Sequence, residues 1–207
     1  MKMTLDEIAC TEITDRSSKG HDYMRTYGEL FEPFRHDPVS LLEIGVLGGA
    51  GLRTWARYFD NPETAIYGLD PYLKEFCGKL DDDRIVLIEG SQAAESTLSA
   101  LAVLGPFHFI LDDGGHFAAA QMKCFQSLWL SVAPGGFYSI EDLHSYAAPE
   151  LCDGKENIMQ FLTRIATEMQ GRGAKAVGKS VPEDSWSDID LIMFRRGLAI
   201  LRKSLSP

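Results

Sequence analysis

Short apolar runs alternate with amphipathic segments along most of this chain, and this alternation limits the folds that are open to it. Buried strands are expected at residues 39–46, 65–69, 84–88, 107–111 and 137–140. Helical periodicity is clearest at residues 51–59, 96–104 and 118–132. Strands that alternate with helices of about ten to fifteen residues are typical of βαβ units with right-handed crossovers. The pattern therefore predicts an α/β fold with a doubly wound, Rossmann-like sheet that is mostly parallel.

The carboxyl-terminal part follows a different pattern. Apolar runs at residues 189–194 and 198–201 are separated only by Arg195-Arg196-Gly197. A connection this short cannot make a parallel crossover, so the two strands must pair antiparallel as a hairpin. We expect this hairpin to close the sheet and the arginines of its turn to be solvated.

Two segments fall outside the predicted sheet. Residues 1–36 precede the first strand and are assigned as an N-terminal cap segment, which leaves residues 37–207 as the main domain. Residues 145–188 separate the fifth strand from the hairpin, with a helix expected at 155–169 and a loop at 171–186. Both segments can cover the edge of the sheet where ligands bind, and we predict that residues 145–188 form a substrate lid.

Charge and composition exclude several classes of protein. The 207 residues carry a net charge of −10, which disfavours a nucleic-acid partner or an anionic membrane. The four cysteines have no CxxC spacing, so free thiols are expected rather than a zinc site or a disulfide framework. The sequence shows neither a secretory leader nor 18 consecutive apolar residues, and a cytoplasmic protein is the expectation.

Acidic residues follow the fourth and fifth strands directly. Asp-Asp-Gly-Gly-His occupies residues 112–116, and Glu-Asp-Leu-His occupies residues 141–144. Neighbouring parallel strands end at the same edge of a sheet, so these side chains should converge. Like charges this close raise one another's pKa unless a cation neutralises them, and a hard divalent ion with oxygen ligands is the simplest solution. His116 could then accept a proton at neutral pH.

Other interpretations of these residues stay open. Asp112 or Asp113 could cap the following helix, with His116 in its first turn. That interpretation leaves the acids at 141–142 unexplained. His144 is either part of the site or an exposed loop histidine.

A glycine-rich turn, Leu-Glu-Ile-Gly-Val-Leu-Gly-Gly-Ala-Gly at residues 42–51, joins the first strand to a helix. It lacks the GxGxxG spacing and the Walker lysine, which disfavours a dinucleotide or a triphosphate. Glu43 beside this turn suits a cationic ligand group, such as the methionyl ammonium of S-adenosylmethionine. Asp70 at the end of the second strand would accept hydrogen bonds from ribose hydroxyls, unless Asp70-Pro71 is simply a turn.

Through the motifs at residues 42–46, 110–116 and 140–144, the chain resembles class I S-adenosylmethionine-dependent methyltransferases. It looks most like the metal-dependent sugar O-methyltransferases of antibiotic biosynthesis, of the mycinamicin and elloramycin type. The likeness runs from Ser18 to Lys203. It implies magnesium-dependent transfer of a methyl group from S-adenosylmethionine to a hydroxyl of a sugar-like natural product, in an enzyme expected to be a homo-oligomer.

The resemblance also implies roles for individual residues. The Mg²⁺ ligands would be Asp113, Glu141 and Asp142, and the general base would be His116. The cofactor would contact Glu43, Gly45, Gly49, Asp70, Ser91, Gln92 and Asp112, and the substrate would contact His144, Tyr146 and Tyr27. Family members commonly read Gly-Asp-Gln after the third strand where this chain reads Gly90-Ser91-Gln92, so Ser91 or Glu89 would have to contact the adenine.

Two other reactions fit the same motifs. One is metal-dependent methylation of a catechol or another phenol. The other is hydroxylation by a protein of the same fold, with iron held by His116, His144 and Asp113. A non-catalytic binding protein is the least favoured interpretation.

Overall fold

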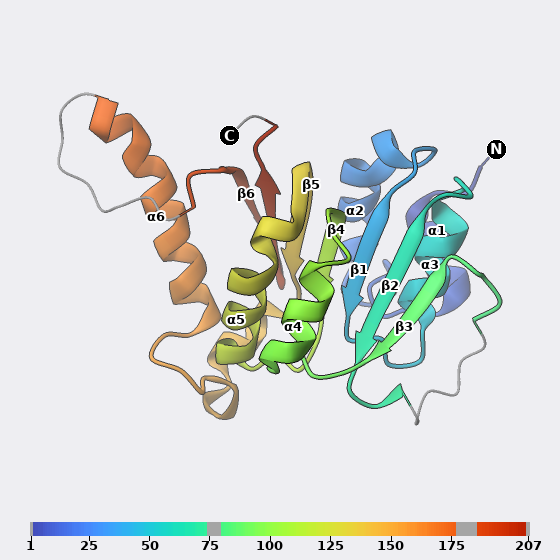
Figure 1. Cartoon of the computed structure of the whole chain (residues 1–207), viewed down its shortest axis with the longest axis horizontal. Helices are drawn as coiled ribbons and strands as arrows, with labels where there is room; N and C mark the ends of the chain where they lie inside the picture. Colours follow the sequence, from blue (N-terminus) through green and yellow to red (C-terminus); the bar gives the residue numbers. More distant parts are fainter. Residues whose placement is uncertain (1, 74–79, 177–185, 206–207) are drawn as a thin grey trace.

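The computed structural model describes residues 2–73, 80–176 and 186–205, and within these ranges the chain forms one seven-stranded sheet (Figure 1). The strand order is β3-β2-β1-β4-β5-β7-β6. The strands are β1 (Ser40–Ile44), β2 (Ala65–Asp70), β3 (Ile85–Glu89), β4 (Phe107–Asp112), β5 (Val132–Ile140), β6 (Ile189–Arg195) and β7 (Leu198–Lys203). The pairs among β1 to β5 are parallel, whereas β7 pairs antiparallel with both β5 and β6. The predicted fold, including its closing hairpin, is confirmed.

Helices cover both faces of the sheet (Figure 1). On one face lie α1 (Leu5–Glu12), α2 (Tyr23–Phe31) and α3 (Ala50–Tyr58), and on the other α4 (Glu95–Ala102), α5 (Ala118–Leu128) and α6 (Ile158–Ala176). Short 3-10 turns occur at η1 (Glu32–Phe34), η3 (Trp129–Ser131), η4 (Leu143–Ala147) and η5 (Pro149–Leu151). The N-terminal segment is thus part of one helical layer.

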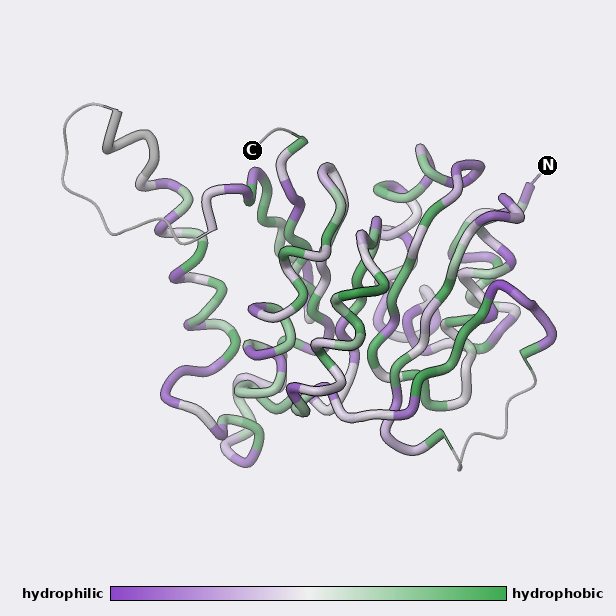
Figure 2. Tube along the Cα trace, viewed as in Figure 1, coloured by the Kyte–Doolittle hydropathy of each residue, from purple (hydrophilic) through white to green (hydrophobic). Residues whose placement is uncertain are grey.

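The central strands are buried on both faces, which explains why they are continuous apolar runs in the sequence. Figure 2 shows hydrophobic residues along these strands. Alternate side chains serve two cores: Leu42 and Ile110 face α4 to α6, whereas Leu41 and Phe109 face α1 to α3. Phe109 is the centre of the second core, with its ring centroid 3.9 Å from that of Phe31.

Two local expectations are wrong. The helix expected at 118–132 ends as α5 at Leu128, and β5 begins at Val132 rather than at residue 137. Pro134 and the two glycines after it form an irregularity inside the strand, because five residues of β5 span two residues of β4 at this point. The loop expected from residue 171 begins later, since α6 continues to residue 176.

The N-terminal helices went unrecognised in the sequence, although α1 carries a clear start signal. Thr4 and Glu7 form a capping box, in which each side chain bonds the backbone N–H of the other residue. Cys10, Cys124 and Cys152 are free thiols as expected, and Cys77 lies outside the described residues. In the described ranges, no helix is both long enough and apolar enough to cross a membrane.

Replacing Phe109 with alanine should lower the free energy of unfolding by about 3–5 kcal/mol, because the cavity left between α2 and the sheet cannot close. Urea denaturation followed by circular dichroism measures this change. Phe194→Ala is the matched control, since Phe194 is 43% exposed on β6 and its loss should cost less than about 0.5 kcal/mol. Equal midpoints for the two variants would contradict this account of the core.

Candidate active site

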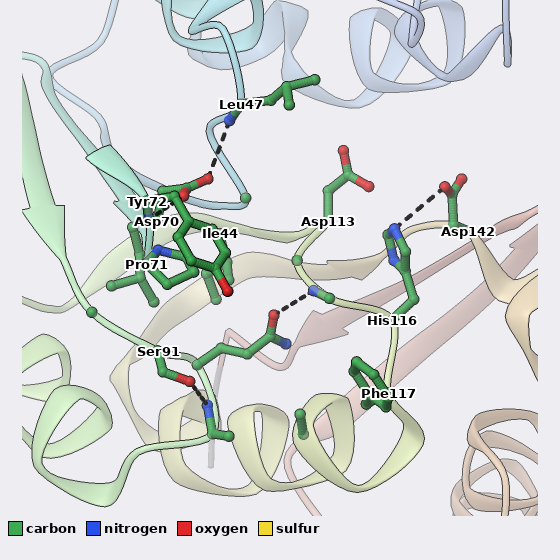
Figure 3. Close-up of a pocket in the computed structure, with 18 of the residues that line it drawn as sticks. Ile44, Leu47, Asp70, Pro71, Tyr72, Ser91, Asp113, His116, Phe117 and Asp142 are labelled. Carbon is green, nitrogen blue, oxygen red and sulfur yellow. Dashed lines mark hydrogen bonds and ion pairs between the residues drawn. The ribbon is translucent and has the colours of Figure 1, made fainter. Parts of the chain in front are cut away.

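A cleft of about 530 Å³ opens at the carboxyl ends of β1, β2 and β4 (Figure 3). The strand order reverses between β1 and β4, and ligands of doubly wound sheets bind at such a switch point. Gly45 forms part of the wall with a φ of +88°, and a Cβ atom at this position would collide with the carbonyl of Asp113. Glycine is therefore required where the first turn passes the fourth strand.

Asp70 is held at one wall of the cleft by backbone groups. Its Oδ2 accepts bonds from the N–H groups of Leu47 (3.2 Å; Figure 3) and Val46 (3.0 Å), and its Oδ1 accepts one from Tyr72 (2.8 Å). Asp70 thus both makes the local turn and joins β2 to the glycine-rich turn. A carboxylate has about four acceptor positions, so Asp70 can still accept one bond from a ligand.

Gln92 and Ser91 line the opposite wall. Gln92 Oε1 accepts a bond from the N–H of Gly115 (2.8 Å), and Gln92 Nε2 donates to Asp112 Oδ1 (3.2 Å). Asp112 itself lies below the cleft, fully buried, and it also accepts a bond from Tyr138. Burial raises the pKa of Asp112 to about 7. Of these residues, Ser91 and Gln92 reach the cleft, and Asp112 holds Gln92 from beneath.

Asp113, His116 and Asp142 come together at one end of the cleft. Each offers one ligand atom, and these atoms lie within 4.8 Å of one another. His116 Nε2 is 3.7 Å from Asp142 Oδ2 (Figure 3). Both residues have left-handed backbones, with φ of +57° and +51°, a conformation that costs energy and is found where function demands it. His116 Nδ1 is buried and has no hydrogen-bond partner in the described part of the chain.

The electrostatics of this group favour an added cation. Burial raises the pKa of Asp113 to about 9; attraction by Arg16 opposes the rise, and repulsion by Glu141, Asp142 and Glu43 adds to it. Burial lowers the pKa of His116. One guanidinium faces four acids here, so a divalent cation with oxygen ligands would relieve the repulsion. The donor set fits Mg²⁺.

Two alternatives from the sequence lose support at this point. The N-cap of α5 is Phe117, and the N–H of Ala119 in the first turn donates to Asp153, so the capping role for Asp112 or Asp113 is wrong. Iron in a facial triad would need two imidazoles. Within the described ranges, the group of side chains that could hold a metal contains His116 but not His144, which lies at a different cavity.

Arg16 completes the site, and sequence analysis missed it. It comes from the loop between α1 and α2 and is only 4% exposed. Its Nε donates to Glu141 (2.7 Å), and its two terminal nitrogens donate to Asp113 (2.6 Å) and Glu43 (3.2 Å). Burial alone would lower the pKa of Arg16, but the three carboxylates raise it well above its ordinary value.

Glu43 and Glu141 point to Arg16 and do not line the cleft. Each is 1% exposed; Glu43 also accepts a bond from Trp55 Nε1 (2.5 Å), and Glu141 accepts one from the hydroxyl of Tyr27 (2.7 Å). Burial raises the pKa of Glu43. Three further predicted contacts also lie away from the cleft: Tyr27 in the core, Gly49 at the start of α3 and Tyr146 exposed on η4.

Replacing Arg16 with methionine should destabilise the protein by about 3–5 kcal/mol, because Glu43 and Glu141 would be left buried without a cation. Urea denaturation at neutral pH measures the loss. Arg25→Met is the matched control, since Arg25 is in the same segment and its ion pairs with Asp6 and Asp22 are exposed. A wild-type midpoint for Arg16→Met would show that this network does not stabilise the fold.

No protein-family model matches the sequence. Similarity to individual proteins is clear. The 8-demethyl-8-(2-methoxy-alpha-L-rhamnosyl)-tetracenomycin-C 3'-O-methyltransferase of Streptomyces olivaceus is 36% identical over 153 residues, which are 70% of this chain and 38% of that enzyme. The mycinamicin VI 2''-O-methyltransferase of Micromonospora griseorubida is 34% identical over 169 residues, which are 74% of this chain and 41% of the relative.

A solved structure shows that the similarity extends to the fold. The MycE methyltransferase of the mycinamycin pathway, in complex with Mg, S-adenosylhomocysteine and mycinamycin VI, superposes with a TM-score of 0.84 at 28% identity. The match covers 98% of this chain and 54% of MycE, so the chain spans about half of that protein and about two fifths of the curated relatives. The resemblance inferred from the motifs is therefore confirmed: the chain is similar in sequence and in fold to sugar O-methyltransferases of antibiotic pathways.

Proposed function

We propose that this chain is a magnesium-dependent O-methyltransferase that moves a methyl group from S-adenosylmethionine to a hydroxyl of a sugar-like natural product. The observation that carries the proposal is the Asp113, His116 and Asp142 group at the end of the cleft. The relatives support it, because they are named as methyltransferases of glycosylated antibiotics and MycE was solved with Mg and S-adenosylhomocysteine.

The cleft suits S-adenosylmethionine, which would supply the methyl group. Its volume of about 530 Å³ lies within the range of small-molecule sites. Gly45 lets the backbone approach the ligand, and Asp70 keeps one acceptor position for a ribose hydroxyl. Ser91 and Gln92, on the far wall, would contact the adenine end.

Asp113 and Asp142 provide the carboxylate oxygens that Mg²⁺ prefers. The ion would lower the pKa of the reacting hydroxyl and orient the acceptor. Glu141 stays the predicted third ligand: its two oxygens each accept one bond, from Arg16 and Tyr27, and each retains a free acceptor position. Arg16 and Tyr27 would then set the direction in which Glu141 points.

His116 is the proposed general base. Because burial lowers its pKa, the imidazole is neutral at pH 7 and can accept the proton of the hydroxyl. Asp142, 3.7 Å away, would stabilise the imidazolium that forms. The rest of the rate acceleration would come from positioning, since the reacting oxygen and the methyl carbon must be held within about 3–3.5 Å.

The surrounding segments complete the proposal. Residues 1–36 would act as a cap, through Arg16, and residues 145–188 as a substrate lid, of which η4, η5 and α6 are described. A cytoplasmic location, a homo-oligomeric state and the lack of nucleic-acid partners stay predictions.

The direct test is incubation with Mg²⁺, S-adenosylmethionine labelled on its methyl group, and two panels of acceptors. One panel contains rhamnose and other deoxysugars, both as glycosides and as sugar phosphates, and the other contains catechols and simple phenols. Label on a sugar is the expected result. Label on the phenols alone would show that the acceptor is a phenol rather than a sugar. If calorimetry detected no binding of S-adenosylhomocysteine, methyl transfer would be rejected.

Replacing His116 with alanine should reduce turnover by about 10²- to 10⁴-fold, the contribution expected of a general base. The affinity for S-adenosylhomocysteine, measured by calorimetry, should stay within about twofold of the wild type because the other walls of the cleft are intact. His36→Ala is the control, since His36 is exposed and pairs with Asp60 on the surface. Loss of cofactor binding in His116→Ala would reject the role as base.

Removing the metal with EDTA should reduce turnover by at least about 100-fold, and added Mg²⁺ should restore it. Asp113→Asn combined with Asp142→Asn should prevent this rescue and abolish Mn²⁺ binding measured by electron paramagnetic resonance. Asp190→Asn, which changes an exposed acid on β6, is the control and should retain both properties. Turnover that survives EDTA would exclude the metal-dependent mechanism.

A further inference from the structure

A second cavity, of about 560 Å³, lies beside the candidate active site. Three parts of the chain form it: the segment that leads into α2, the start of η4, and the turn between β6 and β7. Its principal lining residues are His21, Tyr23, Thr26, His144, Arg195 and Arg196. Nothing in the proposed methyl-transfer step uses this cavity.

The topology places this cavity on the edge of the sheet that carries the active site. Because β7 runs antiparallel to β5, the start of β7 lies at the carboxyl end of β5, with Ala199 opposite Ile140. The N–H of Leu143 donates to the carbonyl of Gly197 (2.9 Å). The turn that carries Arg195 and Arg196 is therefore fixed beside the end of β5, where Asp142 is located.

One side-chain contact separates the two cavities. The hydroxyl of Tyr23 lies 3.0 Å from Asp142 Oδ1 and 3.1 Å from the carbonyl of Gly197. Asp142 lines the first cavity and Tyr23 lines the second. Gly197 has a φ of +74°, and a Cβ atom there would collide with the Tyr23 hydroxyl, so only glycine lets the turn lie this close to Tyr23. An acceptor held at Asp142 would therefore lie one side chain away from the second cavity.

The second cavity is basic, although the chain carries a net charge of −10. Within the described ranges, the guanidinium groups of Arg195 and Arg196 make no hydrogen bond or ion pair. His144 and His21 add two imidazoles, and the ring of His21 stacks on Tyr23 with 5.2 Å between centroids. The acid among the lining residues, Asp22, is offset by Arg25, whose Nε is 3.3 Å from it.

We propose that this second cavity binds a phosphate or diphosphate group of the acceptor, so that the sugar is methylated as a sugar phosphate or as a nucleoside diphosphate sugar. Guanidinium groups bind phosphate oxygens through paired, charge-assisted hydrogen bonds, and two adjacent arginines suit two phosphates. A neutral glycoside would leave the guanidinium groups of Arg195 and Arg196 without a partner. The inference rests on the proposed function, because it takes the reacting hydroxyl to lie at Asp113 and Asp142.

This assignment also gives the enzyme a place in a reaction sequence. A sugar that still carries its phosphate or nucleotide has not been transferred to an aglycone. Methylation would therefore precede the glycosyl-transfer reaction, which breaks the bond between the anomeric carbon and the phosphate.

The test is calorimetric titration of the full chain with inorganic pyrophosphate and, separately, with uridine diphosphate glucose. EDTA is present throughout, so that no metal can bridge the phosphates to the acidic site. The wild type should bind both ligands, and Arg195→Ala combined with Arg196→Ala should weaken each by about tenfold or more. Arg202→Ala is the matched control from the same hairpin, because its guanidinium is bound to Asp190 outside the cavity.

S-adenosylhomocysteine is titrated into each variant in parallel, so that the two proposals are tested separately. Unchanged cofactor binding with no pyrophosphate binding by the wild type overturns the phosphate cavity and leaves methyl transfer intact. Pyrophosphate binding without S-adenosylhomocysteine binding rejects the methyltransferase instead. Equal weakening by Arg202→Ala, or binding of pyrophosphate but not of the sugar nucleotide, also overturns the assignment to the acceptor.

Discussion

A single buried guanidinium determines how the acids of this site are arranged. Arg16 donates to Glu43, Asp113 and Glu141, which stand at the carboxyl ends of β1, β4 and β5. These three strands are neighbours in the sheet, and without a cation their acids would repel one another in a buried environment. The planar fork of arginine can serve all three at once, which a lysine ammonium could not do with the same geometry. The N-terminal segment is consequently fastened to the functional edge of the sheet.

Arg16 also separates the acids into two groups. Glu43 and Glu141 are buried with it and receive second bonds from Trp55 and Tyr27. Asp142 remains at the cleft beside His116, and Asp113 belongs to both groups because it bonds Arg16 and faces the metal-binding position. Four acids against one guanidinium leave a negative surplus at Asp113 and Asp142. A magnesium ion would be balanced by this remaining negative charge, and Asp113 would serve both Arg16 and the ion.

The sequence was sufficient for the fold and for the edge of the sheet where the site lies, because both depend on local patterns. Buried parallel strands are continuous apolar runs, and acids that follow them directly must meet at one edge. The position of Arg16 could not be predicted, since its contact with Glu141 joins residues 125 positions apart. For the same reason the sequence could not show that Glu43 and Glu141 are buried against Arg16. Pro134 was misread because proline and glycine mark turns and irregular strands alike, and only the pairing with β4 distinguishes them.

The closing hairpin of β6 and β7 explains why the two cavities lie side by side. Because β7 pairs antiparallel with β5, the turn at Arg195 and Arg196 lies at the same edge of the sheet as Asp142. If β7 were parallel to β5, it would begin at the opposite edge, and the turn before it would lie there. The acidic and the basic cavity therefore arise from one feature of the topology, and Tyr23 stands between them with its hydroxyl on Asp142. A molecule that bridges the two cavities must be neutral or metal-binding at one end and anionic at the other. A simple glycoside is neutral and has no anionic end. The arginines of the hairpin would therefore select acceptors by their charge.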